Sequence, residues 1–145
     1  MFVVNKIFIS SDHAGIELRQ VLSSYLESLG CTVVDCGCDP EGSESVDYPD
    51  YVPEVVRRIS DTSFGVLICG TGIGMSIAAN RHRNVRAALC FNMSFAKLAR
   101  EHNNANILCF GSRYISQDTA KDVMHAFITT KFLGGRHAIR VQKLG

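Results

Sequence analysis

Short apolar runs alternate along the chain with longer stretches in which apolar residues recur every three or four positions. The runs are rich in Val, Ile and Phe and end at Gly, Ser, Asp or Asn, which is typical of buried strands. The longer stretches have helical periodicity. The pattern predicts strands at 7–11, 31–36, 66–69, 85–90 and 106–110. It predicts helices between Asp12 and Gly30, at about 50–60, through Asn80, at 94–101 and from about Ser116.

Strand and helix therefore alternate five times, which indicates a parallel sheet with helices on both faces. We expect a three-layer α/β/α sandwich with a five-stranded, Rossmann-like parallel sheet, in a single domain over residues 1–145. Gly134-Gly135 follows the last predicted helix and begins a separate C-terminal tail, residues 134–145.

The helix at 94–101 carries Phe95, Leu98 and Ala99 on one face, which we expect to pack inward. His102 continues the same stripe, so its imidazole is expected to point inward as well. A histidine at such a position is either a satisfied core or capping residue or part of a site.

Composition and charge argue against several classes of protein. The chain has 145 residues, 46% of them hydrophobic and 20% charged, with a net charge of +1, which is typical of a globular domain and not of a disordered chain. The even charge balance argues against general binding to nucleic acid or membranes. No apolar stretch approaches the roughly 20 residues of a membrane span, and the N-terminus lacks a signal-peptide pattern. We expect a cytoplasmic protein.

The six cysteines lie mostly within or at the ends of apolar, strand-like runs. Cys36-Gly37-Cys38 does not have the spacing of a zinc or redox motif, and the chain has no Cys-x-x-Cys pair. Most of these thiols are therefore expected to be reduced core residues. No spacing of His or carboxylates indicates a metal site.

Three glycines, Gly70, Gly72 and Gly74, alternate with Thr71 and Ile73 directly after the most apolar strand. A strand, a glycine turn and a helix start can cradle a small anionic or hydroxylated ligand, because backbone N–H groups approach it without a Cβ in the way. The spacing matches neither a dinucleotide fingerprint nor a P-loop, and tight packing alone is the other interpretation.

Cys69 ends that strand, at the edge where ligands bind in open α/β sheets. It is either a core thiol or, beside exposed N–H groups, a nucleophile or base. Thr71 offers a hydroxyl to the same space. Asp12 and His13 end the first strand, so in a parallel sheet they share this edge with Cys69.

Arg136 and Arg140 lie four positions apart and share a face if the tail is helical. With His137 they form the most basic short patch of the chain. They are either solvated surface or, beside the glycine turn, ligands for a phosphate, which guanidinium groups bind bidentately.

Short motifs in the same order and spacing as in a known family cover nearly the whole chain. They are Asp12-His13-Ala14-Gly15, Asp47-Tyr48-Pro49, Ile68-Cys69-Gly70-Thr71-Gly72-Ile73-Gly74, Ala78-Ala79-Asn80, Val85-Arg86-Ala87, His102-Asn103, Phe110-Gly111-Ser112-Arg113 and Gly134-Gly135-Arg136-His137. Together they resemble ribose-5-phosphate isomerase type B, whose wider family includes galactose-6-phosphate isomerase subunits and allose-6-phosphate isomerases.

The resemblance implies interconversion of ribose 5-phosphate and ribulose 5-phosphate through an enediolate, without metal or other cofactor, in the pentose phosphate pathway. It implies that Cys69 is the base, with Thr71 and the N–H groups of residues 70 to 74 around the enediolate. His102 would open the furanose ring. Asp12 and Asn103 would bind the sugar. The phosphate ligands would be His13, Arg113, Arg136 and Arg140.

The resemblance also implies a homodimer with shared active sites, with a tetramer as the alternative, and residues 134–145 reaching the partner. A six-carbon sugar phosphate remains an alternative substrate. Two other classes remain open: a non-catalytic sugar-phosphate sensor, and a hydrolase built on Cys69 and His102.

Overall fold

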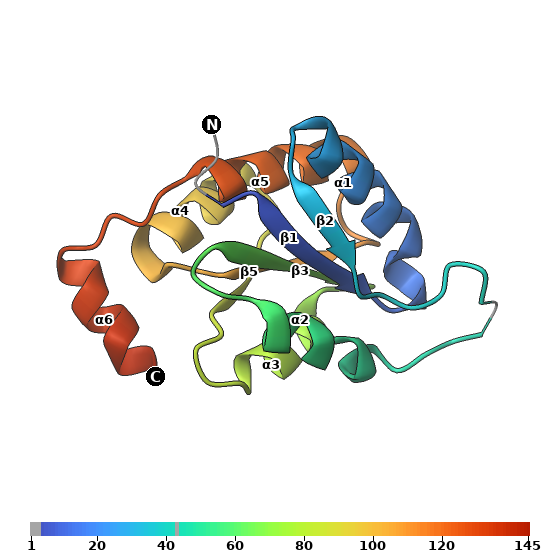
Figure 1. Ribbon diagram of the computed structural model, residues 1–145, viewed down its shortest axis with the longest axis horizontal. Coiled ribbons are helices and arrows are strands. Elements are labelled where there is room, and N and C mark those ends of the chain that lie inside the picture. The colour runs from blue at the N-terminus through green and yellow to red at the C-terminus, as the bar shows by residue number, and fades with distance from the viewer. Residues whose placement is uncertain (1–3, 43) are drawn as a thin grey trace.

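The computed structural model describes residues 4–42 and 44–145 as one α/β domain (Figure 1). Residues 1–3 of the predicted domain and residue 43 of its long loop lie outside this description. The sheet has five parallel strands in the order β2-β1-β3-β5-β4. The predicted fold class is therefore confirmed. The strands are β1 (Lys6–Ser11), β2 (Thr32–Asp35), β3 (Ser63–Cys69), β4 (Ala87–Leu89) and β5 (Ile107–Gly111).

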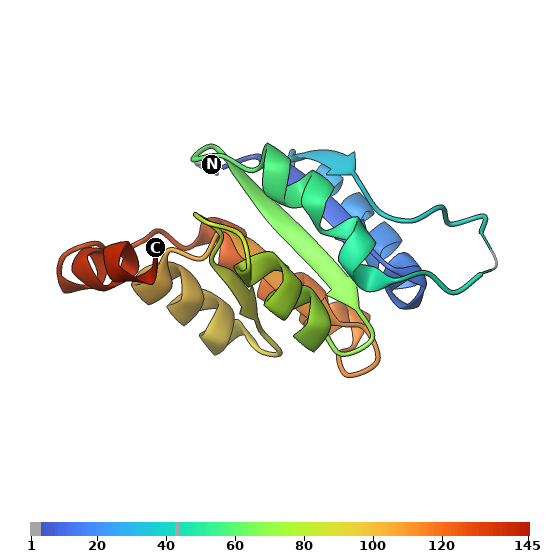
Figure 2. The same cartoon turned by 90° about the horizontal axis from the view of Figure 1, so that it is seen from below.

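Helices cover both faces of the sheet (Figures 1 and 2). One face packs against α1 (Ile16–Ser28), α4 (Met93–Asn103) and α5 (Gln117–Thr129), and the other against α2 (Pro53–Arg58) and α3 (Ile73–Asn80). Because β3 lies in the middle with helices on both sides, all of its seven residues are buried. It begins three residues before the predicted strand, since Ser63 to Gly65 already pair with β1.

The helix expected at about 50–60 is interrupted. A 3-10 turn, η2 (Tyr48–Tyr51), precedes α2, which begins at Pro53. Proline has no N–H to continue the hydrogen bonds of the preceding turn, but it fits the first position of a new helix. The chain becomes extended at Ile59.

The prediction for the face of α4 is correct for Ala99 and wrong for Phe95 and Leu98. Phe95 is 60% exposed and Leu98 41% exposed, whereas Ala96, Ala99 and Arg100 are buried. Small alanines let α4 pack closely against the sheet and α5. The large apolar side chains of this helix therefore face away from the core, where an isolated chain gains nothing from them.

The C-terminal tail forms a helix, α6 (Arg136–Leu144), that projects from the body of the domain (Figure 1). Gly134 and Gly135 both have positive φ, at 66° and 56°, a conformation that other residues rarely adopt. The helix buries none of its residues and contacts α4. Because the tail is helical, Arg136 and Arg140 lie one turn apart.

Candidate active site

The carboxyl ends of β1, β3 and β5 lie together at one edge of the sheet. Ser11 is in register with Ile68, and Cys69 with Gly111. In the sheet, β2 lies on one side of β1 and β3 lies on the other, so the strand order reverses at this point. Open α/β sheets bind ligands at the carboxyl edge beside such a switch point. The expectation that Asp12 and His13 share an edge with Cys69 is confirmed.

Cys69 is nearly buried, with 5% of its surface exposed. Its sulfur accepts a hydrogen bond from the Gly72 N–H at 3.2 Å. The Thr71 hydroxyl accepts one from the Ile73 N–H, also at 3.2 Å. The thiol therefore lies against the glycine turn, with one backbone N–H of the turn donating to it.

Only glycine fits position 72. Its φ is 78°, and a Cβ there would lie 2.8 Å from the carbonyl carbon of Phe110. The turn of β3 is thus packed directly on the end of β5. Gly72 also begins α3, so the first N–H groups of that helix open toward the same edge.

Arg113 covers the first glycine of the turn. A Cβ on Gly70 would lie 2.7 Å from the Arg113 Nη1, so the guanidinium rests on the bare backbone. The position of Arg113 is fixed by the main chain, since its N–H donates to the Gly70 carbonyl and the Ser112 N–H to the Cys69 carbonyl. The structure therefore places a cation directly on the glycine turn that follows Cys69.

Asp12 and His13 follow β1. The Asp12 carboxylate is buried and accepts the Ala14 N–H at 3.0 Å, so it caps a short 3-10 turn, η1 (His13–Gly15), rather than α1 directly. The His13 ring is exposed, but its Nδ1 accepts the Val46 N–H at 3.1 Å. The long loop before η2 thus reaches back to the sheet edge.

Tyr48 belongs to this site although it was not among the predicted site residues. Its ring lies where a Cβ on Gly74 would be, so it covers the start of α3. The sequence gives two signals for Tyr48, its place in the motif Asp47-Tyr48-Pro49 and its place at the end of a long polar loop. Neither shows which residue its ring contacts, because the path of such a loop is set by tertiary contacts.

The remaining predicted residues lie elsewhere in the chain. The helix α4 runs back from the carboxyl edge, and β5 begins at Ile107 shortly after it, so His102 and Asn103 lie toward the amino edge. Figure 2 shows the end of α4 and all of α6 far from the arrowhead of β3. Arg136 and Arg140 are exposed on α6. A single chain therefore does not bring these four residues to Cys69.

The expected inward orientation of His102 is wrong. Its ring is half-exposed and stacks on His137 of α6, with centroids 4.3 Å apart and planes at 11°. The alanine face of α4 packs on the core, and the turn that carries His102 lies outside it.

A cavity of about 1080 Å³ lies at the amino edge, lined among others by Phe64, Arg86 and Arg100, and contains none of the predicted site residues. Within the described residues, no three or more His, Cys, Asp or Glu are placed to hold a metal ion. No helix in the same part of the chain is long and apolar enough to cross a membrane.

Comparisons with known proteins identify the family and agree with the fold. The sequence profile of the Ribose/Galactose Isomerase family matches residues 7–144. A solved structure of ribose 5-phosphate isomerase B from Anaplasma phagocytophilum is 71% identical, with a TM-score of 0.98 over 100% of this chain and 99% of that one. The ribose-5-phosphate isomerase B of Mycoplasma genitalium, solved with bound ribulose-5-phosphate, is 39% identical, with a TM-score of 0.91 over 96% and 93% of the two chains.

Ribose-5-phosphate isomerase B of Escherichia coli is 38% identical over 143 residues, which cover 97% of this chain and 95% of that one. These matches extend through the glycine turn, the end of α4 and the start of α6. The chain therefore belongs to the ribose/galactose isomerase family.

Proposed function

We propose that this protein interconverts D-ribose 5-phosphate and D-ribulose 5-phosphate by proton transfer between C1 and C2, in the cytoplasm and as a step of the pentose phosphate pathway. The observation that carries the proposal is the Cys69 thiol under a turn of backbone N–H groups, in a family of sugar isomerases. A member of that family was solved with ribulose-5-phosphate bound.

In the carbon step, the Cys69 thiolate removes the proton from C2 of the open-chain aldose and returns it to C1. The O1 oxygen gains a proton and O2 loses one, so atoms and charge balance through a cis-enediolate. A carbon acid of this kind is weak, and the negative oxygen must be stabilised as it forms. The donors we assign to it are the Thr71 hydroxyl and the N–H groups of residues 70 to 74. Two of these groups, from Gly72 and Ile73, donate to Cys69 and Thr71 in this structure and would have to turn to the substrate. The buried Asp12 carboxylate is assigned to a sugar hydroxyl.

We assign the opening of the furanose ring to His102. Within a single chain, however, His102 lies far from Cys69. A second copy solves this problem, since an exposed end of α4 in one chain can approach the exposed sheet edge of another. We therefore assign ring opening to His102 of the partner subunit and sugar binding to Asn103 of the partner subunit. The phosphate would be held by His13 and Arg113, together with the partner subunit's Arg136 and the partner subunit's Arg140.

Apolar surface supports the homodimer. Exposed side chains are found on α3 and on the segment that leads from edge strand β4 into α4. They are Ile73, Ile77, Phe91, Met93, Phe95 and Leu98. A second copy that covers this face would remove them from water, which stabilises association.

The separation of Cys69 from His102 also bears on the hydrolase alternative. A Cys–His nucleophile needs the imidazole within hydrogen-bond reach of the sulfur in the working site. Within one chain the two lie at opposite edges of the sheet, so a Cys–His pair, like the proposed isomerase site, would need His102 of the partner subunit. Membership of a family of sugar isomerases favours isomerisation over hydrolysis.

A complementation experiment tests the proposal. Cys69→Ala and His102→Asn variants are each expected to be inactive with ribose 5-phosphate. Mixed dimers formed by refolding equal amounts together contain one intact site, so the mixture should recover about a quarter of the wild-type activity. Recovery would identify a shared site, and no recovery would place both residues in one chain's site.

A second experiment with the wild-type protein identifies the substrate. Allose 6-phosphate and galactose 6-phosphate are assayed in parallel with ribose 5-phosphate, and binding without turnover would indicate a sensor.

A further inference from the structure

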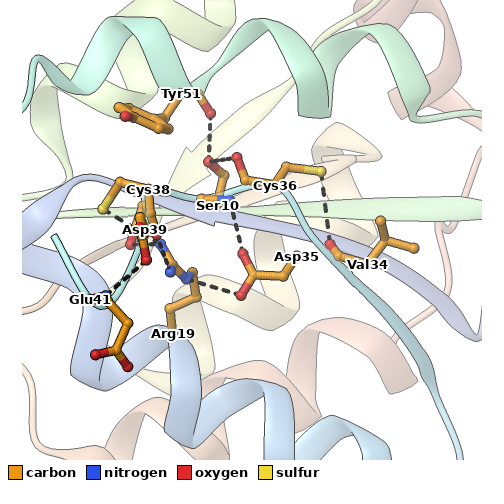
Figure 3. A network of polar contacts seen from close by, with 11 residues as sticks. Ser10, Arg19, Val34, Asp35, Cys36, Cys38, Asp39, Glu41 and Tyr51 are labelled. Atoms are coloured by element: carbon orange, nitrogen blue, oxygen red, sulfur yellow. Dashed lines mark hydrogen bonds and ion pairs between the residues drawn. The ribbon is translucent and has the colours of Figure 1, made fainter.

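Arg19 is an arginine of α1 that is almost completely buried, with 1% of its surface exposed. Its Nη1 donates to the Ser11 hydroxyl at 2.7 Å, and its Nη2 donates to the Cys38 carbonyl at 2.6 Å. Its Nε lies 3.3 Å from the Asp35 carboxylate. These partners are the end of β1, the end of β2 and the start of the loop that follows (Figure 3).

A buried guanidinium is costly unless its charge is paired and its donors are satisfied. Both Nη atoms of Arg19 donate hydrogen bonds, whereas Nε has the ion pair with Asp35 and no hydrogen bond. The backbone is adapted to it at Gly37, where any Cβ would coincide with the Arg19 guanidinium. The Gly37 N–H donates to the Asp35 carboxylate at 2.8 Å, and the Cys38 N–H donates to the Ser11 carbonyl at 3.1 Å.

The loop held in this way returns to the sheet edge at both of its ends. The Ser10 hydroxyl contacts the Cys36 carbonyl at 3.1 Å and the Tyr51 carbonyl at 2.7 Å, so one side chain joins the entry and the exit (Figure 3). Arg19 binds the chain two residues beyond Cys36, where it sets the direction in which the loop leaves the sheet.

The far part of the loop contacts His13. Val46 donates its N–H to Nδ1 of the ring, and the Ser45 hydroxyl lies 3.4 Å from Nε2. Cys38, Val46 and His13 line a common cavity of about 390 Å³. A ring whose Nδ1 accepts a backbone N–H carries its proton on Nε2, because a protonated Nδ1 cannot accept.

From these contacts we infer that Arg19 is a positioning residue for the phosphate site: through the loop it holds His13 as a neutral Nε2–H donor. This inference rests on the proposed function in one respect, the role of His13 as a phosphate ligand. Arg19 itself touches no substrate. Its effect can reach the site by two paths: through the Cys38 carbonyl, the loop and the Val46 N–H, and through Ser11, which precedes Asp12 and His13. Exchange of the Val46 amide reports on the first path.

Two variants disturb the contacts of Arg19 with Ser11, Asp35 and Cys38, here called the Arg19 clamp, by different means. Arg19→Gln removes the guanidinium, and Gly37→Ala displaces it without removing it. Arg57→Gln is the matched control for the arginine, since Arg57 forms an exposed ion pair with Glu54 on α2. Gly42→Ala is the control for the glycine, because its nearest contact would be a 3.2 Å approach to the Asp39 carbonyl within the same loop.

The readouts are hydrogen exchange at the Val46 amide and the affinity for inorganic phosphate, measured by titration. Both clamp variants should speed exchange of the Val46 amide about tenfold or more, and both controls should not. The same variants should weaken phosphate binding about three- to tenfold, the effect of one hydrogen bond. Far-UV circular dichroism confirms folding, and if Arg19→Gln does not fold, Gly37→Ala carries the test.

A double-mutant cycle with His13→Asn separates positioning from general destabilisation. Once His13 is removed, adding Gly37→Ala should weaken phosphate binding no further. Additive losses, or an unchanged Val46 amide in both clamp variants, would overturn the inference. If the wild-type protein does not isomerise sugar phosphates, the proposed function fails, whereas the Val46 exchange still decides whether Arg19 positions the loop.

Discussion

The imidazole rings of His102 and His137 stack face to face, 4.3 Å between centroids, and join α6 to the end of α4. The Leu133 N–H donates to the Glu101 carbonyl at 3.1 Å beside this stack. Partial desolvation and the facing His102 ring lower the pKa of His137. Arg136 and Arg140 lower this pKa further, while Glu101 opposes them. The docking of α6 therefore favours the uncharged form of His137.

Acidification should release α6. Because the pKa of His137 is lowered in the docked state, the released helix binds more protons as the pH falls through the ordinary histidine value of about 6.5. Docking is thus fully favourable above that value and weakens below it. NMR titration of the His137 ring should give a midpoint below 6.5, and the protection factors of the α6 amides, corrected for the intrinsic pH dependence of exchange, should fall at acidic pH.

The control for this prediction is His102→Ala. Removing the facing ring should raise the titration midpoint of His137, while the strands of the sheet keep their protection from amide exchange. An unchanged midpoint in His102→Ala would show that the stack does not govern the titration.

Replacing Cys69 by Ala should abolish isomerisation while preserving the fold. The removed volume is small, and loss of a general base typically costs about 10²- to 10⁴-fold in rate. We expect kcat to fall by that order with little change in the dissociation constant for ribose 5-phosphate. Steady-state kinetics and equilibrium binding measure the two quantities.

Cys109→Ala is the matched control, because Cys109 is a buried thiol on the neighbouring strand β5. Burial raises the pKa of the Cys109 thiol, so it remains protonated and unsuited to act as a base. The Cys109→Ala variant should retain the wild-type kcat. A Cys69→Ala enzyme with near-wild-type kcat would refute the cysteine as base.

His102→Asn should separate ring opening from isomerisation. Ribose 5-phosphate is mostly cyclic in water, so its turnover should be crippled in this variant. Ribulose 5-phosphate has no free hydroxyl at C5 with which to form a furanose, so exchange of its C1 proton with deuterated solvent should survive. Mass spectrometry of the recovered ketose measures this exchange. Equal loss of exchange in His102→Asn and Cys69→Ala, with binding intact, would assign His102 to the enediolate step.

Phe95→Glu should produce a folded monomer without activity. Phe95 is 60% exposed in the single chain, so a charge there does not disturb the core but opposes burial against a second copy. Analytical ultracentrifugation should show a halved mass at low micromolar concentration. Gln117→Glu, an added charge at the start of α5, should leave the mass unchanged.

Much of the fold can be predicted because buried parallel strands are continuous apolar runs, as at Val66 to Cys69. The same reasoning misassigned Phe95 and Leu98 of α4, since an exposed apolar face has the same sequence pattern as a core face. Only packing shows that Ala96 points inward beside Ala99. For the site, strand ends predicted the neighbours of Cys69 correctly. Tyr48 and Arg19 were missed because their contacts depend on the path of the loop between β2 and α2.

The direction of α4 has a kinetic consequence. Its 11 residues carry the chain about 16 Å back from the carboxyl edge, so the proposed acid ends far from the proposed base of its own chain. When each active site needs residues from two chains, dilution lowers the rate by dissociating the dimer as well as by reducing the amount of enzyme. Below the dimer dissociation constant, the specific activity should fall in proportion to enzyme concentration, and the total rate should follow its square.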